Sequence, residues 1–183
     1  MNKKIKWVIG FIIGIILLLV IYLVVTQKEK YFDRIELPQT TMVVNKTQLN
    51  YLDSIVYVGI SELHLTPTVI VLRELTDKNQ PTGDIEDLKL MAYIQGKNHQ
   101  YILNIRKMSR DNSLTVISHE LIHLLQREEE RFIAVDGKII FQDIEYTIEN
   151  MPDYKQRPWE VEAYSKQSKL RKKIEKVLYQ SRK

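Results

Sequence analysis

Residues 114–126 read LTVISHELIHLLQ, and this stretch decides how the rest of the chain is interpreted. Its apolar residues recur three and four positions apart, which is typical of the buried stripe of an amphipathic helix. The segment before it, residues 109–113, is rich in residue types that cap helix N-termini. The sequence therefore predicts a helix with one face in the core, carried by Leu114, Ile117, Leu121, Leu124 and Leu125.

An H-E-x-x-H motif lies beside this stripe. His119 and His123 are four residues apart, so on a helix they share one face and can bind one metal ion. Glu120 projects about 100° further round the helix, where its carboxylate can hold a metal-bound water. The chain has only four histidines, which argues against a coincidental match. Zinc is the predicted cofactor, and the alternative is a helix that carries two surface histidines by accident.

A catalytic zinc ion usually takes three protein ligands and leaves a fourth position for water. The other two histidines, His64 and His99, lie upstream in loop-like or strand-like sequence and are poor candidates for the third ligand. Residues 157–164 (RPWEVEAY) are better placed, because their Pro-Trp pair suits the start of a later helix. Glu160 then lies in the first turn, within reach of the two histidines.

The two motifs together resemble the gluzincin class of zinc metallopeptidases, in which a glutamate on a later helix completes H-E-x-x-H. That glutamate often lies in an E-x-x-A-D or E-x-x-A-N sequence, and Glu160-Val161-Glu162-Ala163 matches the first four positions. Tyr164 departs from the pattern at the fifth position, which leaves the partner that orients a ligand histidine unassigned. The resemblance covers about residues 100–165 and extends to small uncharacterised metallopeptidase-like proteins of bacteria and phages.

The resemblance implies zinc held by His119, His123 and Glu160, with Glu162 as the alternative third ligand. It implies hydrolysis of peptide bonds in a polypeptide substrate by a zinc-activated water, with Glu120 as general base. The candidates for stabilising the oxyanion are Tyr146, Tyr154, Tyr164 and Arg157. A catalytically inactive zincin-fold binding or interaction protein is the alternative function.

The predicted fold class is α+β and zincin-like, with a small mixed sheet packed on the active-site helix. Strands are expected at residues 68–72, 88–94 and 101–105, with the last two able to form a hairpin, and a further hairpin around Asp136-Gly137. Tyr101–Ile105 or its hairpin partner is the predicted edge that binds an extended peptide. Two more helices are expected, one over residues 46–60 capped by Thr47 and one from Trp159 through Leu178.

The N-terminal part carries a different signal. Residues 7–25 read WVIGFIIGIILLLVIYLVV without a charge, long enough for a helix that crosses a bilayer. The run exceeds the apolar core of a signal peptide, the alternative, and no small-residue cleavage site follows it. We therefore predict a tip and anchor at residues 1–27, a connector at residues 28–45 and a catalytic domain at residues 46–183. The short basic N-terminus favours a single-pass protein of the cell membrane with its C-terminal domain outside.

The net charge of +4 comes largely from three lysines that precede the predicted span. Without them, 24 basic residues face 23 acidic ones, so nucleic acid is not an expected partner. The charged run at residues 127–131 and the basic face of the last helix are expected to be solvated, with lipid headgroups as the alternative contact of that helix. The chain has no cysteine, and its oligomeric state is left open.

Overall fold

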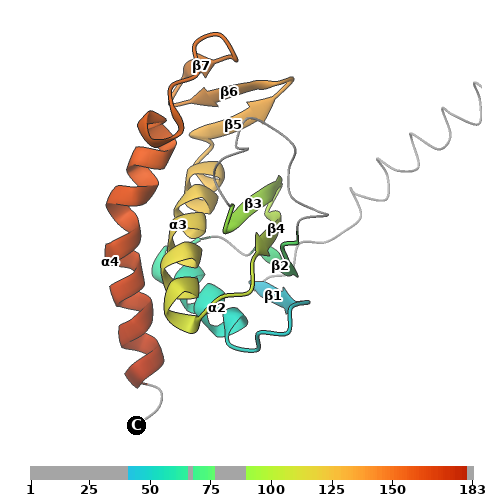
Figure 1. Cartoon of the computed structure of the whole chain (residues 1–183), viewed down its shortest axis with the longest axis vertical. Coiled ribbons are helices and arrows are strands. Elements are labelled where there is room, and N and C mark those ends of the chain that lie inside the picture. The colour runs from blue at the N-terminus through green and yellow to red at the C-terminus, as the bar shows by residue number, and fades with distance from the viewer. Residues whose placement is uncertain (1–40, 66–67, 77–89, 181–183) are drawn as a thin grey trace, which may run out of the picture. The chain divides into compact units, whose positions relative to one another are not determined.

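A four-stranded mixed sheet forms one layer of the fold in the computed structural model (Figure 1). Its strands are β1 (Met42–Asn45), β2 (Val69–Glu74), β3 (Ala92–Lys97) and β4 (Gln100–Ile105), in the spatial order β1-β2-β4-β3. β1, β2 and β4 run parallel, whereas β3 returns antiparallel to β4 and forms the predicted hairpin with it. Among the strands of the described residues, β3 is consequently at the edge, and β4 lies inside the sheet.

The structure describes residues 41–65, 68–76 and 90–180, which fall within one compact unit that begins at Pro38. The predicted membrane span and most of the predicted connector lie outside these residues. Within the described ranges, no helix has the length and apolar character needed to cross a membrane. β1 falls in the last part of the predicted connector. Its four residues carry too short a pattern to indicate a strand, and its parallel partner, β2, is remote in sequence.

The helices of the described residues are α2 (Leu52–Glu62), α3 (Arg110–Glu128) and α4 (Pro158–Gln180). α2 and α3 pack against the sheet, and α4 packs against both of these helices from outside (Figure 1). α3 and α4 extend over the residues where the sequence predicts helices. With its mixed sheet and these helices, the fold belongs to the predicted α+β class.

The start of α2 corrects the prediction that Thr47 caps it, because the helix begins only after Tyr51. Asn45 Oδ1 accepts the backbone N–H of Thr47 at 2.9 Å and its hydroxyl at 2.7 Å. The same hydroxyl accepts the N–H of Leu49 at 3.1 Å. The Thr47 side chain thus stabilises a turn between β1 and α2, and this local pairing competes with helix capping.

The start of α3 agrees with the N-cap signal in the sequence. Ser109 has extended backbone angles, and its hydroxyl accepts the N–H of Asn112 at 3.3 Å. Of the five residues predicted to form the apolar stripe, Leu125 is only partly buried, whereas Leu114 is buried in the core and Ile117, Leu121 and Leu124 are fully buried there. Each such side chain contributes about 1.5–3 kcal/mol relative to exposure. This burial holds the opposite face of the helix in a fixed orientation.

A second, three-stranded antiparallel sheet lies between α3 and α4 in the chain. Its strands are β5 (Phe132–Val135), β6 (Lys138–Phe141) and β7 (Ile144–Tyr146). The predicted Asp136-Gly137 turn joins β5 to β6, and both residues have positive φ, at 50° and 76°. The turn to β7 also uses positive φ, at Gln142 and Asp143. β7 was not predicted, because Gln-Asp lacks the glycine or asparagine that usually signals such a turn.

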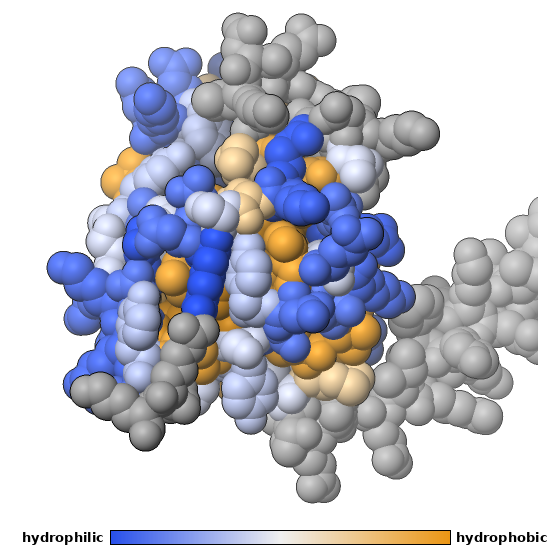
Figure 2. Space-filling view, turned by 60° about the horizontal axis from the view of Figure 1, so that its bottom comes forward, coloured by the Kyte–Doolittle hydropathy of each residue, from blue (hydrophilic) through white to orange (hydrophobic). Residues whose placement is uncertain are grey.

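One apolar core joins the four-stranded sheet to the three helices. Figure 2 shows a face of the molecule on which hydrophilic side chains surround apolar ones that remain visible between them. Few polar residues are buried among the described residues, and most of them lie in α3 and the first turn of α4: Ser113, Ser118, His119, Glu120, Gln126 and Glu160. Burying polar and ionisable groups is costly unless they are paired, which directs attention to this point.

Candidate metal centre

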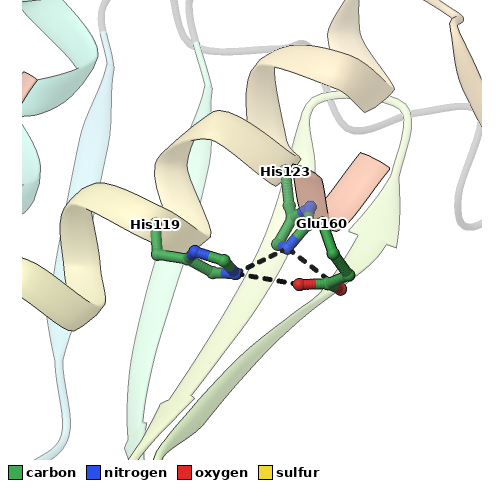
Figure 3. Close-up of side chains that lie close together, drawn as sticks. All are labelled: His119, His123 and Glu160. Carbon is green, nitrogen blue, oxygen red and sulfur yellow. Dashed lines mark hydrogen bonds and ion pairs between the residues drawn. The ribbon is translucent and has the colours of Figure 1, made fainter. Parts of the chain in front are cut away.

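His119, His123 and Glu160 bring their ligand atoms together between α3 and α4 (Figure 3). Nε2 of His119 lies 3.1 Å from Oε2 of Glu160, and Nε2 of His123 lies 3.4 Å from Oε1 of the same carboxylate. The two Nε2 atoms are 3.0 Å apart. A single ion can therefore contact all three side chains.

Two well-anchored helices position these groups. The histidines lie on consecutive turns of α3, whose opposite face is held in the core. Glu160 lies in the first turn of α4 and is 6% exposed. Its neighbour Trp159 is buried and packs edge-to-face against three rings of the second sheet, those of Phe132, Phe141 and Tyr146. The second sheet thus anchors the start of α4 and, with it, the carboxylate.

The donor set fits a zinc ion. Imidazole nitrogens and carboxylate oxygens bind zinc at roughly 2.0–2.2 Å, and around a tetrahedral ion such atoms lie roughly 3.3–3.5 Å from one another. The separations in this cluster run from 3.0 to 3.4 Å. Three protein ligands also leave one position of a tetrahedral ion open, as in catalytic rather than structural zinc sites.

Both histidines have a glutamine on the far side of the ring. His119 Nδ1 lies 3.0 Å from Oε1 of Gln167, and His123 Nδ1 lies 2.9 Å from Oε1 of Gln126. An amide oxygen only accepts hydrogen bonds, so each Nδ1 is the donor to its glutamine, and each Nε2 is left to carry either a proton shared with Glu160 or a metal ion. These glutamines supply the orienting partners that the sequence left unassigned.

Other contacts fix the orientation of the Gln126 amide itself. Its Nε2 donates to the main-chain oxygen of Trp159 at 3.0 Å and to Oε2 of Glu162 at 3.2 Å. Both partner atoms can only accept hydrogen bonds, so the NH2 group of the amide must face them and its oxygen must face His123. Gln126 is fully buried, and through it the first turn of α4 determines which nitrogen of His123 is free to bind a metal.

Glu162, the alternative third ligand, lies away from the ligand cluster. Its carboxylate accepts two hydrogen bonds from Arg131, at 2.7 and 3.0 Å, and one from Lys166 at 2.5 Å. Burial opposes its ionisation, but the hydrogen bonds from Arg131, Lys166 and Gln126 lower its pKa to about 2. Glu162 therefore supports Gln126, and Glu160 is the carboxylate that reaches the histidines.

The electrostatics of the cluster favour a positive charge at the point where the ligand atoms meet. Burial opposes ionisation of Glu160, yet hydrogen bonds with His119 and His123 lower the pKa of its carboxyl to about 2. Burial likewise opposes protonation of His123, but its hydrogen bond with Glu160 and the charge of Glu120 raise its pKa. A proton and a metal ion consequently compete for this point.

Glu120 lies beside the ligand cluster and outside it. Glu120 is only 7% exposed. Its carboxylate accepts a hydrogen bond from the backbone N–H of Ile94 in β3. Burial raises the pKa of Glu120, while the charges of His123 and His119 act in the opposite direction. A carboxyl with a raised pKa that is not a ligand is suited to accept and return a proton.

The four candidates for the oxyanion partner have different surroundings. Tyr154 forms a hydrogen bond with Glu160, and burial together with that carboxylate raises its pKa. The ring of Tyr164 lies 4.7 Å from the ring of His119, centroid to centroid. Arg157 lines the same cleft as Glu120 and donates from Nε to the Pro152 carbonyl at 3.2 Å. Tyr146 packs on Trp159. Tyr154, Tyr164 and Arg157 are therefore the three that border the site.

Two clefts meet at the ligand cluster. One, with a volume of about 210 Å³, contains His123 and Glu160; the other, of about 290 Å³, contains His119. Both are bordered by Glu120, by Tyr154 and by the segment around Ala92 at the start of β3. The edge strand beside the site is therefore β3. Of the two strands that the sequence offered for that edge, Tyr101–Ile105 is excluded because β4 is paired on both sides, and its hairpin partner β3 is the edge strand.

The charged run at residues 127–131 is not simply solvated, contrary to expectation. The side chain of Glu128 is 6% exposed and binds Oη of Tyr101 and Nδ1 of His99, each at 2.6 Å. Arg131 pairs with Glu162 at the end of α3. The run contacts β4 and α4, a packing that charge pattern alone does not reveal. His99 is accordingly held by Glu128, away from the ligand cluster.

Sequence reasoning missed Gln126 and Gln167. Gln126 follows His123 by three residues and Gln167 follows Glu160 by seven, so both spacings place them on the helix faces that carry the ligands. Glutamine is a common surface residue of helices, and the spacing becomes informative only once the ligands are known.

Comparisons with family models, curated proteins and solved structures found no match to this chain.

Proposed function

We propose that the chain is a zinc-dependent peptidase with a zincin-like catalytic domain that acts on polypeptides. The observation that carries this proposal is the position of Glu120. It is buried beside a complete set of three ligands, is not one of them, and borders both clefts. A structural zinc site has no use for such a carboxylate, whereas hydrolysis requires a group that accepts a proton.

The residues of the chain divide the chemistry between them. His119, His123 and Glu160 would hold the ion, which when bound supplies a Lewis acid that polarises a carbonyl and lowers the pKa of water. Glu120 accepts the proton of the attacking water and returns it to the leaving amine. The N–H of Ile94 holds the Glu120 carboxylate against β3. Tyr154 and Arg157 border the place where charge develops on the carbonyl oxygen.

The arrangement of elements supports a zincin-like interpretation of the α+β fold. The edge strand β3 lies next to the helix that carries H-E-x-x-H, and a later helix supplies the glutamate. Among the described strands β3 pairs only with β4, so an extended peptide could add along its other edge through main-chain hydrogen bonds. Such a peptide would pass from one cleft to the other across the ligand cluster.

The decisive experiment measures metal content and proteolysis on the full-length chain purified in detergent. We expect about one zinc per chain and hydrolysis of an unfolded protein substrate. Glu120→Gln should retain the metal and lose turnover, whereas His119→Ala should lose both. Glu145→Gln is the matched control, since Glu145 is an exposed residue paired with Lys138. A wild-type chain that binds no zinc at neutral pH contradicts the proposal.

A chain that binds zinc but cleaves nothing would instead support the alternative of a non-catalytic binding protein at the membrane.

We further propose that residues 7–25 anchor the protein in the cell membrane with the catalytic domain outside, a proposal supported by the uncharged run and the basic N-terminus. Protease added to intact cells should then degrade the C-terminal part. Full protection of that part would reverse the proposed orientation.

A further inference from the structure

Arg127 continues the row of functional side chains on α3. It follows His123 by four residues, as His123 follows His119, so the three lie on successive turns of one face. The smaller cleft at the ligand cluster, of about 210 Å³, is bordered by His123, Glu160 and Arg127 together. The guanidinium group is therefore one helical turn beyond the second histidine, in the cleft beside the proposed reaction site.

The guanidinium of Arg127 is half-buried, and one of its nitrogens has no hydrogen-bond partner among the described residues. Its Nε is buried and has no hydrogen-bond partner, and within the described part of the chain no carboxylate forms an ion pair with it. The neighbouring acid, Glu128, binds Tyr101 and His99 instead. Cζ of the guanidinium lies 4.6 Å from the centroid of the Phe132 ring, and the charge of Glu120 also acts on the group. A stacked guanidinium keeps its in-plane N–H groups available for an anion.

The charge balance of the cleft also favours an anion. Besides His123, the acidic and basic side chains that line it are those of Glu120, Glu160, Arg127 and Arg157. A divalent ion held by the histidines and Glu160 would compensate the charges of the two carboxylates. The two arginines are then left as uncompensated positive charges in a partly enclosed space, where electrostatic attraction is stronger than in bulk water.

We propose that Arg127 binds a carboxylate of the substrate and thereby makes the site selective for acidic peptides. This inference rests on the proposed peptidase function and adds the chemical class of its substrate. Arginine suits the role because its planar fork matches both oxygens of a carboxylate. The carboxylate belongs either to an aspartate or glutamate side chain or to the C-terminus of the peptide.

The test measures peptide binding rather than turnover, on the zinc-loaded full-length chain carrying Glu120→Gln. Short alanine-based peptides carry one glutamate moved along the sequence, each with a matched glutamine peptide, and each is made with a free and with an amidated C-terminus. We expect about 10- to 100-fold tighter binding of the carboxylate-bearing peptide at one position, the range for a charge-assisted hydrogen-bonded pair. The two series separate an acidic side chain from a C-terminal carboxylate.

Arg127→Gln should abolish this preference while the chain still binds zinc, and Arg127→Lys should retain part of it. Arg73→Gln, which removes the same charge from an exposed position on β2, should leave the preference unchanged. Equal binding of glutamate and glutamine peptides, or an unchanged preference in Arg127→Gln, overturns the role of Arg127.

The two proposals fail separately. A preference for acidic peptides in a chain that hydrolyses none of them overturns the peptidase proposal and supports Arg127 as a carboxylate-binding residue. Hydrolysis without any such preference supports the peptidase proposal and overturns the role of Arg127.

Discussion

The side-chain amide of Gln126 accepts a hydrogen bond from Nδ1 of His123 at 2.9 Å. Because the other end of the amide donates to acceptors on α4, this contact determines the tautomer of the imidazole. We therefore expect the zinc affinity of the proposed site to depend on Gln126, which is not one of its ligands.

Gln126→Ala should lower zinc affinity by about 10- to 100-fold, the usual effect of removing a partner that orients a ligand histidine. The variant leaves all three proposed ligands in place, so it should still bind zinc at saturating metal. Competition against a fluorescent chelator measures the affinity. Gln156→Ala is the matched control, because Gln156 is exposed in the short 3₁₀ helix Tyr154–Gln156. An unchanged affinity in Gln126→Ala would show that the hydrogen bond plays no part in binding.

Glu160→Gln and Glu162→Gln should differ sharply in zinc affinity. Glu160 is the proposed third ligand, so its loss should lower the affinity by more than about 100-fold, beyond the effect of losing a residue that only orients a ligand. Glu162 acts through Gln126, and its replacement should cost about 10-fold or less. The same chelator competition compares the two variants directly. A larger loss in Glu162→Gln would identify Glu162 as the third ligand and contradict the geometry of the cluster.

Much of this site could be predicted from the sequence because its groups have local signatures. His119 and His123 are one helical turn apart, and the capped amphipathic pattern around them indicates the helix that aligns them. Glu160 was predicted from the start of a later helix. What the sequence does not contain is the angle between α3 and α4, which decides that Glu160 and not Glu162 faces the histidines.

The parts of the fold that escaped prediction depend on non-local contacts. β1 is a four-residue strand whose partner, β2, follows only after a helix. β4 lies inside the sheet because it pairs in parallel with β2. The sequence of the β3–β4 hairpin does not indicate this pairing. Glu128 belongs to a run of charges, and only the fold shows that it is buried against Tyr101.

Gly59→Val should destabilise the protein by about 1–3 kcal/mol, the usual cost of adding atoms to a packed core. A Cβ at Gly59 would meet the side chain of Leu121 and lie 3.2 Å from Cδ1 of Ile174, so the glycine lets α2 approach α3 and α4 closely. Urea denaturation of the full chain measures the change. Ser61→Ala, at an exposed position of the same helix, should change stability by less than about 0.5 kcal/mol. Equal stability of Gly59→Val and the wild type would contradict the close packing.

The ion pair between Glu162 and Arg131 should stabilise the fold in a pH-dependent way. The folded-state pKa of Glu162 is lowered to about 2, whereas a glutamate in an unfolded chain titrates near about 4.3. The stabilisation is therefore fully present above about pH 4.3 and is lost as the pH falls towards 2. Solvent screening limits this stabilisation to about 1 kcal/mol.

In metal-free protein, Glu162→Gln should lower the free energy of unfolding at pH 6 and have little effect near pH 2. Glu145→Gln, whose partner Lys138 is exposed, should show almost no such dependence. A Glu162→Gln effect that is the same at both pH values would mean that the carboxylate charge does not contribute.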